Sequence, residues 1–247
     1  PVGDSTNPDL IWWGTWGAGL LKFSKSKGET EYFMSSPDNP DKTVSANTVS
    51  FLYQDDAGMI WLCTRGGGLD RFDPRTEKVA AKYKHFPAKP DTISSNSVHQ
   101  VFQDSAGRHW VTTDKGLDRF APDTGKFERY NKQNRRFPLN TTMQIQEDVQ
   151  GVLWISGHYT GELVRFDPES EDFRLYTPDD GILSGIGTGY AAIRTRDGAL
   201  WFFCSNGINT FHPDKIRDNS YQPRVFLTSL TQGGEPVETG TATEQVK

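Results

Sequence analysis

Two aromatic positions recur five times along the chain and constrain its fold more than any other feature of the sequence. Tryptophan recurs at intervals of 44 to 49 residues and phenylalanine at intervals of 45 to 49 residues. Each phenylalanine follows its tryptophan by 10 to 12 residues. A period of about 47 residues suits a four-stranded β-propeller blade and is too long for a helical pair. The anchors are Trp12, Trp61, Trp110, Trp154, Trp201, Phe23, Phe72, Phe120, Phe166 and Phe211.

The second repeat shows the strand order expected within one blade. An aspartate-glycine turn at 55–58 and a glycine run at 66–68 separate alternating strands, because glycine tolerates positive φ and aspartate accepts backbone N–H groups. Alternate side chains of a strand point to opposite faces, so we expect the anchor rings to fill the space between neighbouring blades and to carry the fold only. The predicted strands are 47–55, 59–64, 69–72 and 78–83.

Composition agrees with an all-β chain. The 24 glycines and 14 prolines can form turns, and 12% of the residues are aromatic. The net charge of −5 argues against a nucleic-acid partner, because no basic stripe is present to displace counterions. No window approaches the roughly 20 apolar residues of a membrane span. Cys63 and Cys204 lie on predicted core strands and are interpreted as small buried hydrophobic residues.

The two ends of the repeat array are irregular. The first copy begins near Asp9 and lacks the first strand, and the fifth has Thr195 where the others have aspartate. Two arrangements are open: a closed five-bladed ring, or part of a seven-bladed ring that would need about 330 residues. The missing strand favours the larger ring. We expect blades over 1–217, and over 218–247 a linker and the first strand of a β-sandwich.

Three short motifs carry a family resemblance. They are Asn-x-Val, Asp-x-x-Gly-x-x-Trp and Gly-Leu-x-Arg-Phe-Asp-Pro, and together they resemble the two-component regulator propeller repeats. The segment 222–230 resembles the start of the immunoglobulin-like domain that follows such propellers. Departures are Thr195, Gly187 in place of asparagine, and the absent aromatic outer strand of the fifth copy.

The resemblance implies an extracytoplasmic sensor module of a membrane-bound bacterial receptor, either a hybrid histidine kinase or a diguanylate cyclase. It implies that this fragment is not an enzyme and that any catalytic output lies beyond residue 247. The implied partners are the missing blades, the immunoglobulin-like domain, a second receptor copy in a membrane-anchored homodimer, and a small-molecule or oligosaccharide ligand. The implied location is periplasmic or extracellular, with the fragment itself soluble. No cofactor is implied.

No catalytic motif is present. The sequence has no Gly-x-Ser-x-Gly, His-Glu-x-x-His, phosphate loop or Cys-x-x-Cys. The five histidines occupy different repeat positions, so we expect no metal site. Asp55, Asp104 and Asp148 could be mistaken for a ring of carboxylates, but their fixed place before a glycine predicts turn capping.

Loops between the second and third strands offer the best ligand-binding candidates. Such loops lie on one face of a propeller, and five of their residues break a glycine-rich pattern. Aromatic rings stack on sugar faces, and arginine or lysine recognises acidic groups. An ordinary variable loop or a contact to a neighbouring domain is the alternative. The candidates are Trp16, Arg65, Lys115, His158 and Tyr159, and weaker ones between blades are Arg135, Arg136, Phe137 and Tyr190.

Two other functions remain open. A propeller enzyme acting on carbohydrate, of the glycoside hydrolase or lyase type, would need two carboxylates or a histidine with a partner on one face. Asp114 and Glu162 are the only acidic residues of the loop set that qualify. A protein-interaction scaffold is the other alternative, because one fold hosts many functions.

Overall fold

The computed structural model describes residues 1–38, 43–133, 137–158, 161–183 and 191–217, and two short strands beyond them. The chain divides into two compact units, Pro1–Lys215 and Ile216–Lys247. In the second unit, β20 (Thr231–Gln232) pairs with β21 (Glu235–Pro236). The predicted sandwich strand at 222–230 lies outside the described residues. None of the helices in the described part of the chain is long and apolar enough to cross a membrane.

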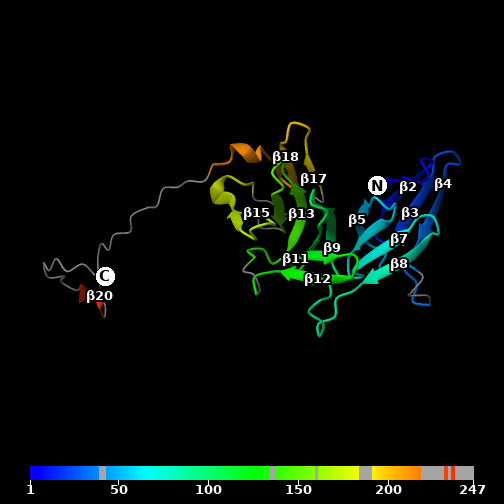
Figure 1. Cartoon of the computed structure of the whole chain (residues 1–247), viewed down its shortest axis with the longest axis horizontal. Coiled ribbons are helices and arrows are strands. Elements are labelled where there is room, and N and C mark those ends of the chain that lie inside the picture. The colour runs from blue at the N-terminus through cyan, green and yellow to red at the C-terminus, as the bar shows by residue number, and fades with distance from the viewer. Residues whose placement is uncertain are drawn as a thin grey trace. The chain divides into compact units, whose positions relative to one another are not determined.

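The first unit contains five successive antiparallel sheets in its described residues (Figure 1). Each strand pairs with its neighbour in sequence, as expected for propeller blades, so the predicted all-β class and the four-stranded sheets are confirmed. The sheets are β1 (Val2–Gly3), β2 (Leu10–Gly14), β3 (Leu20–Ser24), β4 (Glu29–Phe33); β5 (Val49–Gln54), β6 (Ile60–Thr64), β7 (Leu69–Asp73), β8 (Lys78–Tyr83); β9 (Val98–Gln103), β10 (His109–Thr113), β11 (Gly116–Ala121), β12 (Lys126–Tyr130); β13 (Thr142–Glu147), β14 (Leu153–Gly157), β15 (Leu163–Phe166), β16 (Phe173–Tyr176); and β17 (Ala192–Arg194), β18 (Leu200–Cys204), β19 (Gly207–Phe211). Two 3₁₀ turns, Pro178–Asp180 and Pro213–Lys215, complete the regular elements.

The expectation that the first repeat lacks its first strand is wrong. The first repeat does have an inner strand, since Val2 of β1 pairs with Trp12 and Gly3 pairs with Ile11. Asp4 follows this strand and takes the place of the turn aspartate. The sequence pattern missed the strand because only two residues of it pair and neither belongs to an Asn-x-Val motif.

The turn aspartates bind the blade tryptophans as well as the backbone. One oxygen of Asp104 accepts the backbone N–H of Arg108 at 2.8 Å, and the other accepts the Trp110 indole N–H at 2.9 Å. The same indole bond joins Asp55 to Trp61, Asp148 to Trp154 and Asp4 to Trp12. A buried indole N–H needs an acceptor, so the aspartate satisfies the turn and the core together.

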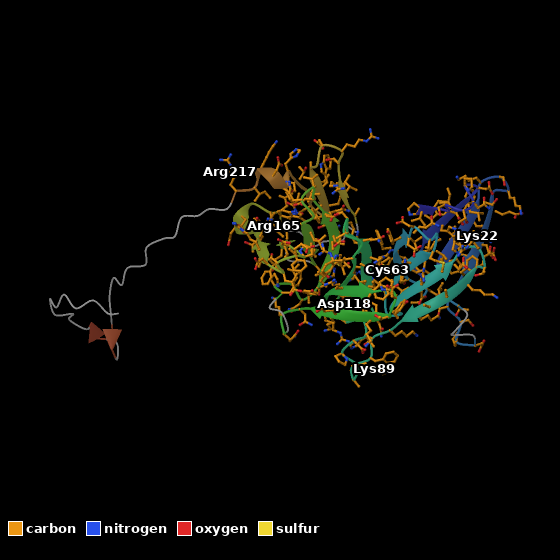
Figure 2. All side chains as sticks on the ribbon, in the orientation of Figure 1. Lys22, Cys63, Lys89, Asp118, Arg165 and Arg217 are labelled. Carbon is orange, nitrogen blue, oxygen red and sulfur yellow. The ribbon has the colours of Figure 1, made fainter. Side chains whose placement is uncertain are left out.

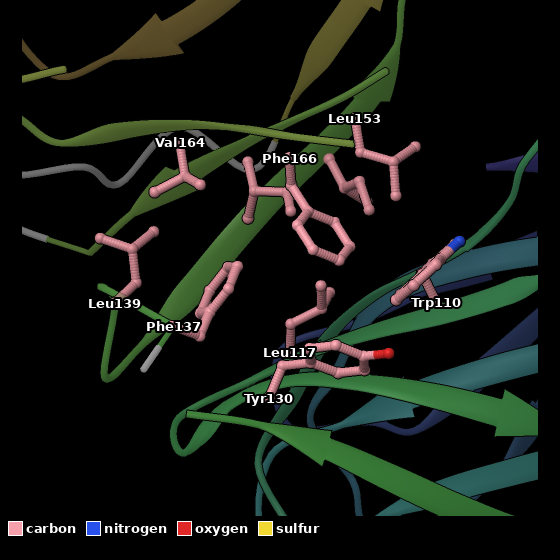
Figure 3. Close-up of a cluster of buried hydrophobic side chains, with 10 residues drawn as sticks. Trp110, Leu117, Tyr130, Phe137, Leu139, Leu153, Val164 and Phe166 are labelled. Atoms are coloured by element: carbon pink, nitrogen blue, oxygen red, sulfur yellow. The ribbon is translucent and has the colours of Figure 1, made fainter. Parts of the chain in front are cut away.

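Between sheets, each tryptophan packs on the anchor phenylalanine of the next sheet. Ring centroids are 5.2 Å apart for Trp12 and Phe72, 5.4 Å for Trp61 and Phe120, 5.6 Å for Trp110 and Phe166, and 4.8 Å for Trp154 and Phe211. Figure 3 shows the Trp110 and Phe166 rings converging with Tyr130 and Phe137. These contacts form the hydrophobic core between blades.

The anchors at the two ends of the array are less buried than expected. Trp12, Trp61, Trp110 and Trp154 are at most 1% exposed, whereas Phe23, Phe211 and Trp201 are half-buried. Phe23 has no tryptophan from a preceding sheet, and Trp201 has no phenylalanine from a following sheet, among the described residues. The exposure of Phe23 and Trp201 therefore follows from their position in the array, whereas Phe211 is half-buried although Trp154 packs on it.

Inner strands of neighbouring sheets are joined by side chains that bind backbone. Gln100 of β9 accepts the Ile145 N–H of β13 at 3.0 Å and donates to the Ile145 carbonyl at 3.3 Å. Ser50 of β5 donates to the Val98 carbonyl of β9 at 2.9 Å, and Gln146 of β13 donates to the Ala192 carbonyl of β17 at 2.7 Å. Polar inner-strand residues thus fix one blade against the next.

Both cysteines are free thiols. Cys63 is fully buried, which raises the pKa of its thiol, but Cys204 is only half-buried, so the prediction that both are buried is wrong for Cys204. Figure 2 shows Cys63 and Asp118 among the strands of the first unit. Asp118 is also fully buried, with its pKa raised to about 7 by loss of solvation.

Candidate functional site

Four of the most distinctive loop residues occupy one position of the repeat. Each is the fourth residue after its blade tryptophan: Trp16, Arg65, Asp114 and His158. They lie in the loops between β2 and β3, β6 and β7, β10 and β11, and β14 and β15. The equivalent residue of the fifth sheet, Ser205, is exposed. We call Trp16, Arg65, Asp114 and His158 the loop track.

Backbone contacts fix the loops of Trp16, Arg65 and Asp114 against the following blade. Trp16 pairs with Thr48, and Arg65 pairs with Ser97, which are the residues that lead into the next inner strand. The Thr141 hydroxyl likewise donates to the Asp114 carbonyl at 3.2 Å. The first three loops are therefore each tied to the residues that lead into the following blade.

Trp16 and Arg65 form the first contact of the loop track. The Arg65 guanidinium carbon lies over the Trp16 ring, 5.1 Å from its centroid. Trp16 is 65% exposed, so much of its indole surface is open to a ligand. An exposed indole beside a guanidinium combines an apolar face with planar hydrogen-bond donors.

Asp114 and His99 form the second contact. His99 lies on β9, where Thr112 pairs with Gln100 and Thr113 with Val98, so His99 is the extra residue of a β-bulge. Its Nε2 lies 2.8 Å from Asp114 Oδ1. A carboxylate only accepts hydrogen bonds, so Nε2 carries the hydrogen. This hydrogen bond, with charges on His99 and Arg65 adding to it, lowers the pKa of Asp114.

His158 completes the loop track from the fourth sheet. Its ring centroid lies 6.2 Å from that of His99. Burial lowers the pKa of His158, and the charges of His99 and Arg65 lower it further, while Asp114 opposes them. At neutral pH the neutral imidazole can both donate and accept a hydrogen bond. Charges from the second and third sheets therefore act on this imidazole of the fourth sheet.

The remaining candidates separate into three groups. Lys115 is exposed, and no hydrogen bond or ion pair joins its ammonium group to another described residue. Tyr159, Arg135, Arg136 and Tyr190 lie outside the described residues. Phe137 is 1% exposed and packs against Phe166, with centroids 5.9 Å apart, so it belongs to the core. Of the sequence candidates, the structure thus brings together Trp16, Arg65 and His158.

Sequence reasoning missed His99 as a site residue and weighed Asp114 only as a catalytic acid. The shared repeat position would have identified Asp114. Nothing in the sequence pairs it with His99, because fifteen residues separate them and the equivalents of His99 are Ser50 and Met143. The bulge that directs His99 is visible only in the strand pairing.

The loop track supplies hydrogen-bond donors and acceptors. In the described part of the chain, no group of three or more His, Cys, Asp or Glu is placed to hold a metal ion. Glu162, the other acidic candidate, lines a separate hollow between the fourth and fifth sheets with Gln144, Leu183 and Asn209. The side chain of His99 is 1% exposed, whereas that of Asp114 is 42% exposed.

Comparisons with known proteins agree with the repeat. Residues 92–115 match the family model described as two component regulator propeller. A curated relative, histidine kinase P4 of Formosa agariphila, is 27% identical over 114 residues, which are 46% of this chain and 8% of the relative. The chain therefore spans a small part of that protein.

Two solved structures share the fold. The extracellular domain of the hybrid two component system BT4673 from B. thetaiotaomicron superposes with a TM-score of 0.69 and 19% identity, over 87% of this chain and 29% of that one. Virginiamycin B lyase from Staphylococcus aureus superposes with a TM-score of 0.58 and 16% identity, over 87% of this chain and 69% of that one. At these identities the likeness concerns the β-propeller fold.

Proposed function

We propose that this chain, of which residues 92–115 match the two component regulator propeller, is a ligand-input module of a membrane-bound bacterial signalling receptor. Its place would be the periplasmic or extracellular side, and its receptor a hybrid histidine kinase or a diguanylate cyclase. The observation that carries the proposal is the loop track. Four different side chains at one repeat position meet on one face, and none of them is needed for the blade core.

Binding, and not catalysis, is the chemistry that these side chains favour. The best acid-base pair is Asp114 with His99, and the His99 imidazole is buried behind the carboxylate. The His99 side chain is only 1% exposed, which favours a role in orienting Asp114 over direct proton transfer with a ligand. The pair is therefore suited to orienting a carboxylate, and we assign no reaction to this chain.

The end sheets support the idea that the five sheets belong to a larger ring. Trp201 and Phe23 are the two anchors whose partners are absent from the described residues, and a neighbouring blade on each side would supply them. We propose that the parent receptor contains these blades, and that 218–247 leads into an immunoglobulin-like domain. A ligand or a domain contact would then bias a two-state arrangement of a receptor homodimer.

The test uses the whole parent receptor in its host. Transcriptional or cyclic-nucleotide output is measured against candidate ligands for wild type and for Trp16→Ala and Arg65→Ala. The proposal expects both variants to reach wild-type abundance and to lose most of the ligand response. Lys78→Gln, at an exposed position on the outer strand β8 and outside the loop track, is the control. Equal responses in the wild type and both track variants would contradict a ligand role for this face.

A further inference from the structure

The loop between the second and third sheets is held in place by one arginine of the third sheet. This loop spans residues 84–97 between β8 and β9, and Figure 2 labels Lys89 on it. The Arg129 guanidinium of β12 donates to the Thr92 carbonyl at 2.8 and 2.9 Å. It also donates to the carbonyls of Lys89 at 3.0 Å and Ile93 at 3.3 Å. A single side chain therefore binds three carbonyl groups of loop 84–97.

Asp118 of β11 holds the same loop from inside the protein, and its two oxygens are used unequally. Oδ2 accepts the Ser94 backbone N–H at 2.8 Å. Oδ1 is buried and has no hydrogen-bond partner in the described part of the chain. The Ser94 hydroxyl lies 2.7 Å from Thr113 Oγ1. A buried charge with one oxygen unsatisfied is costly, so the neutral carboxyl group suits this place better than the carboxylate.

The second sheet has the same arrangement with both oxygens satisfied. Asp70 and Asp118 occupy one repeat position, since each pairs with the residue that follows its blade tryptophan. Ser45 donates its backbone N–H to one oxygen of Asp70 and its hydroxyl to the other, both at 2.6 Å. Ionised Asp70 thus has a donor at each oxygen, whereas ionised Asp118 has a donor at one. The third sheet is therefore the one whose contact depends on the charge of its aspartate.

Arg129 is the charged group that acts on Asp118. The two residues pair directly across β11 and β12, so their Cβ atoms are about 5 Å apart. Loss of solvation raises the pKa of Asp118 to about 7, while the contacts of Ser94 and the charge of Arg129 oppose this rise. Among the described residues, no second charged group contributes to the shift. The guanidinium thus lies between a buried carboxyl group and the loop carbonyls.

The other charged groups of loop 84–97 are engaged elsewhere. Asp91 forms an ion pair with Lys126 of β12 at 3.6 Å, and Lys84 and Lys89 are exposed. His85 Nδ1 lies 2.8 Å from a carbonyl oxygen of the same loop. A carbonyl oxygen only accepts, so this nitrogen carries hydrogen in both the neutral and the charged imidazole. The His85 contact therefore persists whichever form is present.

We propose that Asp118, Ser94 and Arg129 form a pH-sensitive latch on loop 84–97. While Asp118 is neutral, Arg129 binds the loop carbonyls and the latch is closed. An ionised Asp118 attracts the guanidinium away from them, because a hydrogen bond between two charged groups is stronger than one to a neutral carbonyl. The latch is therefore tightest at acidic pH and is released as pH rises through 7. The inference goes beyond the proposed ligand-input function and does not depend on it.

The latch can act on the loop track through the residues that follow Ser94. The Asn96 carbonyl accepts the Gly66 N–H at 2.9 Å. Ser97 pairs with Arg65. Both contacts come from the last residues of loop 84–97, within three positions of the latch. Release of the loop should therefore also loosen the backbone around Arg65.

Amide hydrogen exchange of the 247-residue chain tests the latch between pH 5 and pH 8. Protection is corrected for the intrinsic pH dependence of exchange, so that it reports local opening. In wild type, the amides of loop 84–97 should lose at least tenfold protection between pH 5 and 7 and level off above pH 7, because opening then releases a proton from Asp118. The Gly66 amide should follow them.

Four variants assign the effect to its residues. Asp118→Asn cannot ionise, so its loop protection should change less than twofold over the same pH range. Asp70→Asn, the matched change in the second sheet, should keep the wild-type profile of loop 84–97, and so should His85→Gln. Arg129→Gln should lower loop protection at pH 5 to within about threefold of the wild-type value at pH 8, since the carbonyls lose their donor.

Misfolding is separated from release of the latch by a distant reference. The amides of β13 and β14 in the fourth sheet should keep their wild-type protection in every variant. If Asp118→Asn lowers protection there, Asp118→Leu takes its place, because leucine has a similar volume and no ionisable group. The comparison between pH 5 and pH 7 within one variant then still shows whether Asp118 is the titrating residue.

Several results would overturn the proposal. They are a wild-type loop whose protection does not change with pH, a change that persists without the Asp118 carboxyl group, and a change that His85→Gln abolishes. Wild-type protection of Arg129→Gln at pH 5 would reject the role of the arginine, and an unresponsive Gly66 amide would reject the link to the loop track. The ligand-input function stands or falls separately, with the response of the parent receptor.

Discussion

The indole of Trp110 in the third sheet meets the ring of Phe166 in the fourth edge-on, with centroids 5.6 Å apart and planes at 83°. Trp110 is 1% exposed, so Trp110→Ala should lower the free energy of unfolding by about 3–5 kcal/mol. Denaturant titration of the purified chain measures this. Trp201→Ala, at the half-buried equivalent position, should cost clearly less. Equal losses of unfolding free energy in the two variants would show that the contact between Trp110 and Phe166 does not contribute to stability.

Asp104 should stabilise the chain through the same tryptophan. Asp104→Ala removes the acceptor of the buried indole N–H and of the Arg108 backbone N–H. Leaving buried donors unpaired costs about 1–3 kcal/mol. The midpoint of chemical unfolding reports the loss, with Asp123→Ala, an exposed turn residue, as control. A change within about 0.5 kcal/mol would rule out a net contribution from the aspartate.

Two glycines of one loop should respond differently to alanine. Gly66 and Gly68 both have φ near +90°, which an L-residue adopts only with strain. A Cβ on Gly66 meets open space, but a Cβ on Gly68 would collide with the Tyr83 carbonyl oxygen. Gly66→Ala should therefore cost about 1 kcal/mol and Gly68→Ala considerably more. Thermal unfolding of the two variants distinguishes them, and similar losses would contradict the close approach of β8.

Asp118 should make stability depend on pH. Burial raises its pKa to about 7, against about 3.9 in the unfolded chain. The folded state then binds more protons than the unfolded state between about pH 4 and 7. The contribution of Asp118 is therefore present below pH 4 and is lost as pH rises through 7. The groups around it are Ser94, whose N–H donates to Oδ2 at 2.8 Å, and Arg129.

Asp118→Asn should remove this part of the pH dependence. The measurement is the difference in unfolding free energy between wild type and variant from pH 4 to pH 8, with Asp123→Asn as exposed control. The variant should gain stability relative to wild type as pH rises. A difference that stays constant over this range would show that Asp118 does not titrate in the folded chain near pH 7.

The fold was largely predictable from the sequence because the anchors are local and repeated. The outer strand of the second sheet, 78–83, was predicted to the residue, since a proline turn and alternation define it. The inner strand β1 was not, because a two-residue strand carries no periodic pattern. The exposure of Trp201 also escaped prediction, because it depends on a neighbouring sheet and not on the repeat that contains it.

The candidate site was predictable only in part. Trp16, Arg65 and His158 could be found because they interrupt glycine loops, and the structure brings them together. Lys115 interrupts a loop as well, yet its neighbour Asp114 makes the contacts. His99 could not be found, because its position comes from a bulge and its partner lies on another strand.

The contacts between successive sheets all use the same two residue types: the tryptophan of one sheet packs on the anchor phenylalanine of the next. Deletion of the whole second repeat would bring Trp12 opposite Phe120 and restore a tryptophan–phenylalanine contact. Deletion of half a repeat would leave a tryptophan and a phenylalanine without partners. Such a chain can lengthen or shorten by whole repeats through duplication or deletion of its gene segment. The natural unit of such a change is one blade, and each added blade brings one more loop between its second and third strands.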